Sequence, residues 1–174
     1  MDVVRTRLNQ FSGTVYIESE PGKGTTIHIR VPLTLAIMPT LMVELGKQEQ
    51  VFALPLANVN EILDFDQDSL KVLDGQQVLL LRGKPLPLYQ LGNWLTPRSA
   101  QAEIEGHVVV VNIGTMIIGL LVDRLIGREE VVIKPLGALL HGTRGMSGAT
   151  VTGNGKIALI LDLPGLVQSY AGYH

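Results

Sequence analysis

The sequence predicts a mainly β protein in which small barrels or a sandwich follow a short helix–strand–strand unit. From Leu35 onward, short apolar segments alternate with turns rich in glycine, proline and asparagine, a texture typical of such folds. Apolar residues make up 46% of the 174 residues and charged residues 17%, which is the composition of a chain that builds a core. This length allows one medium domain or two very small ones.

The first thirty residues predict a helix and a hairpin. Val4, Leu8 and Phe11 recur at the spacing of one helical face, and Gly13 can end the helix. Two alternating segments then flank the turn sequence SEPGKG, with these apolar positions: Val15, Ile17, Ile27 and Ile29. So small a unit cannot bury both its helix stripe and its sheet face, so it reads as the last part of something larger.

The unpartnered apolar face of this unit predicts self-association. Its strands also offer unpaired edges, which can pair with another chain. Disorder and packing onto the chain's own barrels are the competing outcomes, because ordering costs about 1–2 kcal/mol per residue in backbone entropy. We expect a symmetric dimer joined through residues 1–33.

The remainder of the chain divides into two runs of predicted strands. A polar stretch, residues 96–105, separates the two halves, and no clear repeat relates them, although each could form a barrel. The turns between strands are marked by Gly46, by Arg82-Gly83-Lys84-Pro85 and by Gly153-Asn154-Gly155. The expected strands are 35–45, 50–54, 77–82 and 85–88 in the first half, and 107–113, 115–122, 130–134, 148–152 and 156–161 in the second.

Bulk properties exclude several classes of protein. A net charge of −2 gives no electrostatic reason to expect a nucleic acid or an anionic membrane as partner. The absence of cysteine excludes disulfides and thiolate metal sites. No apolar run approaches the roughly 18 residues that a membrane-spanning helix needs, and the first ten residues do not form a secretory signal. We expect a soluble cytoplasmic protein.

No residue set predicts a catalytic or metal site. The stretch Asp64–Asp68 begins like a calcium loop, but Ser69 and Gly75 replace the glycine and glutamate that the loop requires. The four histidines do not pair at ligand spacing. Asp123 and Asp162 each follow an apolar strand and are expected to cap turns by accepting hydrogen bonds from backbone N–H groups. The single tryptophan, Trp94, is expected in the core or between barrels at least as readily as at an interface.

The N-terminal sequence resembles a known domain. SEPGKGTTIHIRVPL resembles the closing hairpin of the histidine-kinase ATP-binding domain, and MDVVRTRLNQFSGTVYIES resembles the helix and strand before it. The resemblance implies that residues 1–33 are the C-terminal remnant of an α/β ATP-binding domain. Thr25 takes the position of a threonine that contacts adenine through water in that superfamily. The magnesium-holding asparagine helix and the Asp-x-Gly-x-Gly loop are missing, so we expect no cofactor in this chain; ATP and magnesium belong to the parent kinase.

The longer part resembles the CheW-type fold, which packs two five-stranded, Src-homology-3-like (SH3-like) barrels side by side. The resemblance rests on VFALPLANVNEIL, LLLRGKPLPLYQL, VVVVNIGTMIIGLLVDRLIGREEVVIKPLG and GATVTGNGKIALILDLPGL. It implies a CheW-like domain over 34–174, with barrel one at about 35–95 and barrel two at about 106–167. EEVVIKPLG, followed so soon by GATVTGNGKIALILD, is similar to the regulatory domain of chemotaxis histidine kinases of the CheA family.

This resemblance implies a regulatory module of two-component signalling without catalysis of its own. Its expected partners are a CheW-type coupling protein and the cytoplasmic tips of chemoreceptors, at receptor arrays on the inner membrane. A free-standing CheW-type coupling protein and a small-ligand-binding β-barrel are the alternatives. Each candidate for the partner face could instead be a core residue: Val59, Ile62, Leu80, Arg82, Leu86 and Leu88.

Overall fold

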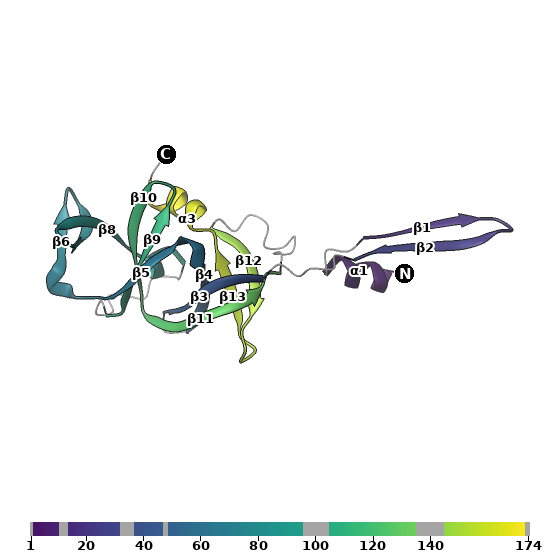
Figure 1. Cartoon of the computed structure of the whole chain (residues 1–174), viewed down its shortest axis with the longest axis horizontal. Coiled ribbons are helices and arrows are strands. Elements are labelled where there is room, and N and C mark those ends of the chain that lie inside the picture. The colour runs from purple at the N-terminus through teal and green to yellow at the C-terminus, as the bar shows by residue number, and fades with distance from the viewer. Residues whose placement is uncertain are drawn as a thin grey trace. The chain divides into compact units, whose positions relative to one another are not determined.

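The chain forms two compact units. The computed structural model describes residues 2–10, 14–31, 37–46, 49–95, 105–134 and 145–172. Its first unit is Met1–Ala36 and its second is Ile37–His174 (Figure 1).

The first unit is the helix and hairpin that the sequence predicts. Helix α1 (Asp2–Gln10) precedes strands β1 (Thr14–Glu20) and β2 (Gly24–Arg30), which pair antiparallel. The register places Val15 opposite Ile29 and Ile17 opposite Ile27, so the apolar side chains share one face. Ile17, Ile27 and Ile29 remain 45%, 50% and 56% exposed, so a large part of this face is open to solvent.

The second unit contains a five-stranded and a six-stranded sheet. The five-stranded sheet has the order β11-β3-β4-β13-β12 and the six-stranded sheet the order β5-β9-β10-β8-β7-β6. The first consists of β3 (Ile37–Leu45), β4 (Gln50–Pro55), β11 (Arg124–Val132), β12 (Met146–Val151) and β13 (Ile157–Leu161). The second consists of β5 (Val59–Asp64), β6 (Leu70–Leu73), β7 (Gln76–Leu81), β8 (Lys84–Gln90), β9 (His107–Ile113) and β10 (Met116–Val122). Helices α2 (Leu91–Leu95) and α3 (Leu163–Tyr170) and two short 3₁₀ turns complete the unit.

The sheets do not follow the two halves of the sequence. The predicted grouping places residues 35–95 in one barrel and 106–167 in the other. Instead, β3 and β4 join the C-terminal strands through a parallel pair between β4 and β13, and the β9–β10 hairpin joins β8 through a second parallel pair. Each sheet therefore combines segments from both halves. The ladders of the described strands are open, with six and five strands, rather than two closed five-stranded barrels.

Two strands, β5 and β6, lie outside the predicted set. In β5 the pairing with β9 shifts between Val59 and Glu61, and this bulge breaks the alternation of apolar and polar side chains. Strand β6 has only four residues, too few for alternation to be recognised. Its turn to β7 needs positive φ at two positions, which Asp74 (φ 49°) and Gly75 (φ 80°) supply.

Three buried clusters hold the second unit together. The largest lies between the sheets and takes alternate residues of β3, β4, β9 and β10, together with Leu163, Leu166 and Val167 of α3. The intervening residues of β3 and β4 form a cluster inside the five-stranded sheet, and those of β9 join a cluster inside the six-stranded sheet. Strands β3, β4 and β9 are thus apolar on both faces because each face meets a core.

Candidate protein-interaction surface

Two of the six candidate partner-binding residues belong to the core. Leu86 is 5% exposed and Leu88 is 2% exposed, and both pack inside the six-stranded sheet with Leu79, Val108 and Val110. Their assignment to the partner face is therefore wrong. Along β8 the side chains alternate, and the neighbours Pro85 and Pro87 are the ones directed away from this cluster.

Two further candidates, Val59 and Ile62, are half-buried. Both lie on β5 and pack against the cluster between the sheets. Their exposed parts lie at an end of the six-stranded sheet, because β5 pairs only with β9. They contribute at most the margin of an interaction surface.

The last two candidates, Leu80 and Arg82, are on the surface. Leu80 is 49% exposed, and the side chain of Arg82 is 77% exposed. Arg82 and Gly83 form the tight turn between β7 and β8 with φ of 50° and 78°. The guanidinium Nη2 of Arg82 donates to Oε2 of Glu61 on β5 at 2.9 Å, which links the turn to the opposite end of the sheet.

Leu80 shares its face of the sheet with two other exposed apolar residues. It pairs with Pro85 of β8, and antiparallel partners project from the same face. Leu73 of the edge strand β6 is 51% exposed and also lies on this face, opposite Gln76 at the other end of β7. Its neighbour Val72, which is 63% exposed, projects from the opposite face. We call the set of Leu73, Leu80 and Pro85 the β6–β8 surface; sequence reasoning missed Leu73 because strand β6 was not predicted.

Charged side chains surround the β6–β8 surface. The exposed residues Lys71, Asp74, Arg82 and Lys84 come from the same strands and from their connecting turns. An apolar patch with a charged margin is the usual arrangement of a protein–protein interface.

Thr25 lies on an exposed part of β2. Its hydroxyl is 3.1 Å from the hydroxyl of Ser19, its register partner on β1.

Two of the acidic residues singled out in the sequence, Asp66 and Asp123, accept hydrogen bonds that stabilise turns. Asp66 accepts from the backbone N–H of Asp68 at 3.0 Å and from the Ser69 hydroxyl at 2.9 Å. Asp123 accepts from the backbone N–H of Gly46 at 2.6 Å, a cap that joins two distant loops. Asp162 differs from the prediction: it precedes α3, but its side chain forms no capping bond. Within the described ranges, no group of three metal-ligating side chains gathers.

Trp94 belongs to an aromatic cluster formed by residues of α2, α3 and β8. It lies in α2, is partly buried against the central cluster, and stacks on Tyr170 of α3 with ring centroids 5.7 Å apart. Tyr89 packs against its other side at 5.1 Å. This arrangement agrees with a core role. Of the helices described, none is long and apolar enough to span a membrane.

Comparison with known proteins identifies relatives of the sequence. The family described as the CheW-like domain matches residues 39–171. The chain is 43% identical over 169 residues to the sensor histidine kinase CheAY of Helicobacter pylori. It is 40% identical over 168 residues to the chemotaxis protein CheA of Salmonella typhimurium and 36% identical over 171 residues to that of Treponema pallidum.

The alignments cover most of this chain and a small part of each relative. They span 97%, 95% and 97% of the chain, but 21%, 25% and 21% of the three proteins. Among solved structures, the scaffolding protein TtCheW from Thermoanaerobacter tengcongensis superposes with a TM-score of 0.62 at 18% identity. That match covers 76% of this chain and 94% of TtCheW and shows a shared, mainly β fold.

Proposed function

Because the chain belongs to the CheW-like domain family, with a role in chemotaxis coupling or regulation, we propose that it is the regulatory module of a chemotaxis histidine kinase. The alignments to the kinases include the helix–hairpin unit, since they reach 95–97% of the chain, whereas the family match begins at residue 39. A free-standing coupling protein would not account for the first 36 residues. The kinase-associated module therefore fits both units of the chain.

The module would act by docking to a CheW-type coupling protein through the β6–β8 surface. The observation that carries this proposal is the set of exposed apolar side chains that two tightly turned hairpins present on one face, Leu73, Leu80 and Pro85. Full burial of a large aliphatic side chain contributes about 1.5–3 kcal/mol, so covering the exposed halves of Leu73 and Leu80 contributes roughly 1.5–3 kcal/mol in all. The hairpin backbone is fixed beforehand, which lowers the entropic cost of binding.

Contact with the tips of chemoreceptors would place the module in receptor arrays at the inner membrane, on the cytoplasmic side. Receptor state would then be relayed to the kinase as a shift between two arrangements that differ in these contacts. The 2.9 Å ion pair between Arg82 and Glu61 lies beside the docking surface and would be altered by such a shift.

Titration of the chain with the CheW-type protein of the same organism tests the docking proposal. Leu80→Asp should weaken binding at least tenfold, because it places a charge on the β6–β8 surface. Ile157→Asp is the matched control, since Ile157 is 70% exposed on β13 of the other sheet. Both variants should melt like the parent chain. If the two variants bind the CheW-type protein with equal affinity, Leu80 is not part of the docking surface.

We further propose that the chain neither binds ATP tightly nor transfers phosphate. Thr25, the one residue matched to the nucleotide site, is exposed, and its hydroxyl lies 3.1 Å from that of Ser19. Incubation with radiolabelled ATP and magnesium should leave the chain unlabelled. Incorporation of label that survives denaturation would contradict the proposal and would require an active site on this chain.

A further inference from the structure

The five-stranded sheet almost closes on itself at its two end strands. Strands β11 and β12 are the ends of the sheet, yet they meet at one point. The backbone N–H of Lys134 donates to the carbonyl of Ala149 at 2.9 Å, and the N–H of Ala149 returns a bond to the carbonyl of Lys134 at 3.0 Å. This single bridge lies at one end of the seam between the two strands.

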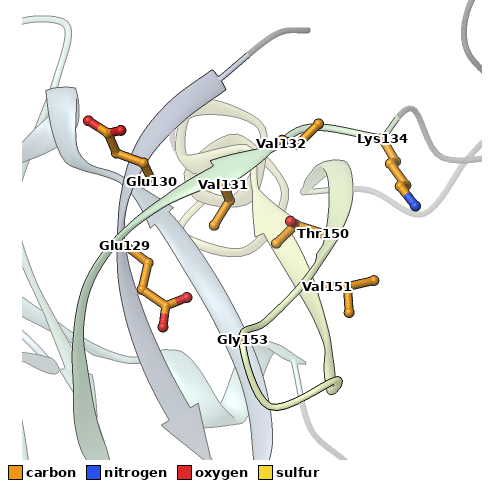
Figure 2. A pocket seen from close by; sticks show the side chains of 8 residues that line it. All are labelled: Glu129, Glu130, Val131, Val132, Lys134, Thr150, Val151 and Gly153. Atoms are coloured by element: carbon orange, nitrogen blue, oxygen red, sulfur yellow. The ribbon is translucent and has the colours of Figure 1, made fainter.

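Beyond the bridge the two strands separate. An antiparallel ladder continuing from Lys134 and Ala149 would pair Val132 with Val151 and Glu130 with Gly153. These four residues line a cavity of about 430 Å³ instead. Figure 2 shows them on the two facing segments, with the space between. The seam is thus a wedge, closed at the bridge and open toward the β12–β13 turn.

The floor of the wedge combines an apolar and a polar side chain. Val131 and Thr150 are each 4% exposed, and they point toward each other across the gap in Figure 2. Val131 packs on the cluster inside the sheet. The hydroxyl of Thr150 forms no hydrogen bond with a described residue and is not fully buried, so it is open to water or to a ligand in the cavity.

The wall formed by β11 presents the carboxylate of Glu129. Glu129 and Glu130 are adjacent strand residues, so their side chains project from opposite faces, and in Figure 2 Glu129 points toward the gap and Glu130 away from it. Both are exposed, and neither forms an ion pair with a residue in the described ranges. The one lysine of the cavity, Lys134, is at the bridge, four residues farther along the strand than Glu130. The open part of the wedge therefore favours a basic side chain, and its two strand edges favour an extended backbone.

We propose that the wedge between β11 and β12 binds an extended segment of a partner protein by strand addition. The segment carries a Lys or Arg beside Glu129 and a small β-branched side chain over Val131 and Thr150. Main-chain pairing supplies affinity, and the acidic wall selects the sequence. This site lies on the five-stranded sheet and is independent of the β6–β8 surface, so either proposal can fail without the other.

A pair of model peptides tests the proposal on the whole chain. The probe is acetyl-Lys-Val-Thr-Val-Lys-Val-Thr-amide, and the control replaces both lysines by glutamate. Amide chemical shifts of the ¹⁵N-labelled chain are followed during titration to millimolar peptide. We expect the lysine peptide to shift residues 129–134 and 149–153 and the glutamate peptide to bind at least tenfold more weakly.

Two variants distinguish binding at this site from non-specific binding. E129K/E130K changes only exposed side chains and should reverse the preference between the peptides. Thr150→Val keeps the side-chain shape and removes the hydroxyl. This change should weaken the binding of the lysine peptide about fivefold. The proposal is overturned if neither peptide shifts these residues, if the shifts fall on β5, β6 or the N-terminal hairpin, or if E129K/E130K leaves the preference unchanged.

Discussion

Gly119 is the position at which the core inside the six-stranded sheet tolerates no added atom. It lies in the middle of β10, paired with Val110 of β9 and with Leu88 of β8. A Cβ built on Gly119 would be 2.9 Å from Cγ1 of Val108, 3.1 Å from Cδ1 of Leu88 and 3.2 Å from Cδ2 of Leu86. Carbon atoms in good contact are about 3.5–4.0 Å apart, so Gly119→Ala forces three buried side chains to move.

The expected loss of stability follows from two opposing terms. Overpacking a well-filled core costs about 1–3 kcal/mol. Replacing glycine by alanine also restricts the unfolded chain and stabilises the folded state by about 0.4–1 kcal/mol. The net expectation for Gly119→Ala is a loss of about 1–2 kcal/mol, which lowers the melting temperature by about 2–4 °C per kcal/mol.

Urea unfolding measures this loss against a matched control. Gly153→Ala changes a glycine in the exposed β12–β13 turn that has no atom within 4 Å of an added Cβ and no positive φ. It should change the free energy of unfolding by no more than about 0.5 kcal/mol. Gly119→Ala should lower the midpoint with an unchanged slope. Combination with Val108→Ala should cost less than the sum of the two single changes, because the first contact is then removed.

The reasoning is refuted if Gly119→Ala is as stable as Gly153→Ala, or if its cost adds fully to that of Val108→Ala. Either result would mean that Leu86, Leu88 and Val108 do not converge on β10 as described.

Three further predictions concern the core, an ion pair and the first unit. Leu86→Asp should abolish the cooperative melting transition in circular dichroism, because it buries a carboxylate at a site that is 5% exposed. A melting transition like that of the parent chain would show that Leu86 is not a core residue. Arg124→Met removes the 3.0 Å partner of Glu44, whose side chain is 10% exposed, and should cost about 1–3 kcal/mol in urea unfolding. The loss should shrink in a Glu44→Gln background, and an equal loss there would show that the pair is not its cause. The full chain should be dimeric in light scattering through residues 1–33, and a chain beginning at Thr34 should be monomeric; identical states would exclude this segment as the contact.

The local elements could be read from the sequence with few errors. Alternating apolar residues predicted β1 and β2, and short apolar segments predicted β3, β7, β8, β9 and β10 to within a few residues of their observed bounds. The expected strand 130–134 covers only the last part of β11. The turn at Arg82-Gly83 was marked by its residues, since a two-residue hairpin needs positive φ. Strands β5 and β6 were not predicted, because a bulge interrupts the two-residue period in β5 and because β6 has only four residues.

The candidate surface could be predicted only in part. Leu80, Arg82, Leu86 and Leu88 belong to one hairpin and look alike in sequence, as apolar or basic residues near a turn. Burial divides them, because β8 turns Leu86 and Leu88 toward β9 and β10, which are supplied from some twenty to thirty residues farther along the chain. No pattern within the hairpin contains that information.

By itself the sequence determined the mainly β class, the two units, the family likeness and the position of most strands, because these depend on side-chain spacing over a few residues. Only the tertiary structure decided which strands share a sheet. The pairs of β4 with β13 and of β8 with β10 form through backbone N–H and C=O groups that every segment carries, so their choice depends on how the three buried clusters fill space together. The same long-range packing separates core from surface at Leu86 and Leu80, and it leaves the wedge open between β11 and β12.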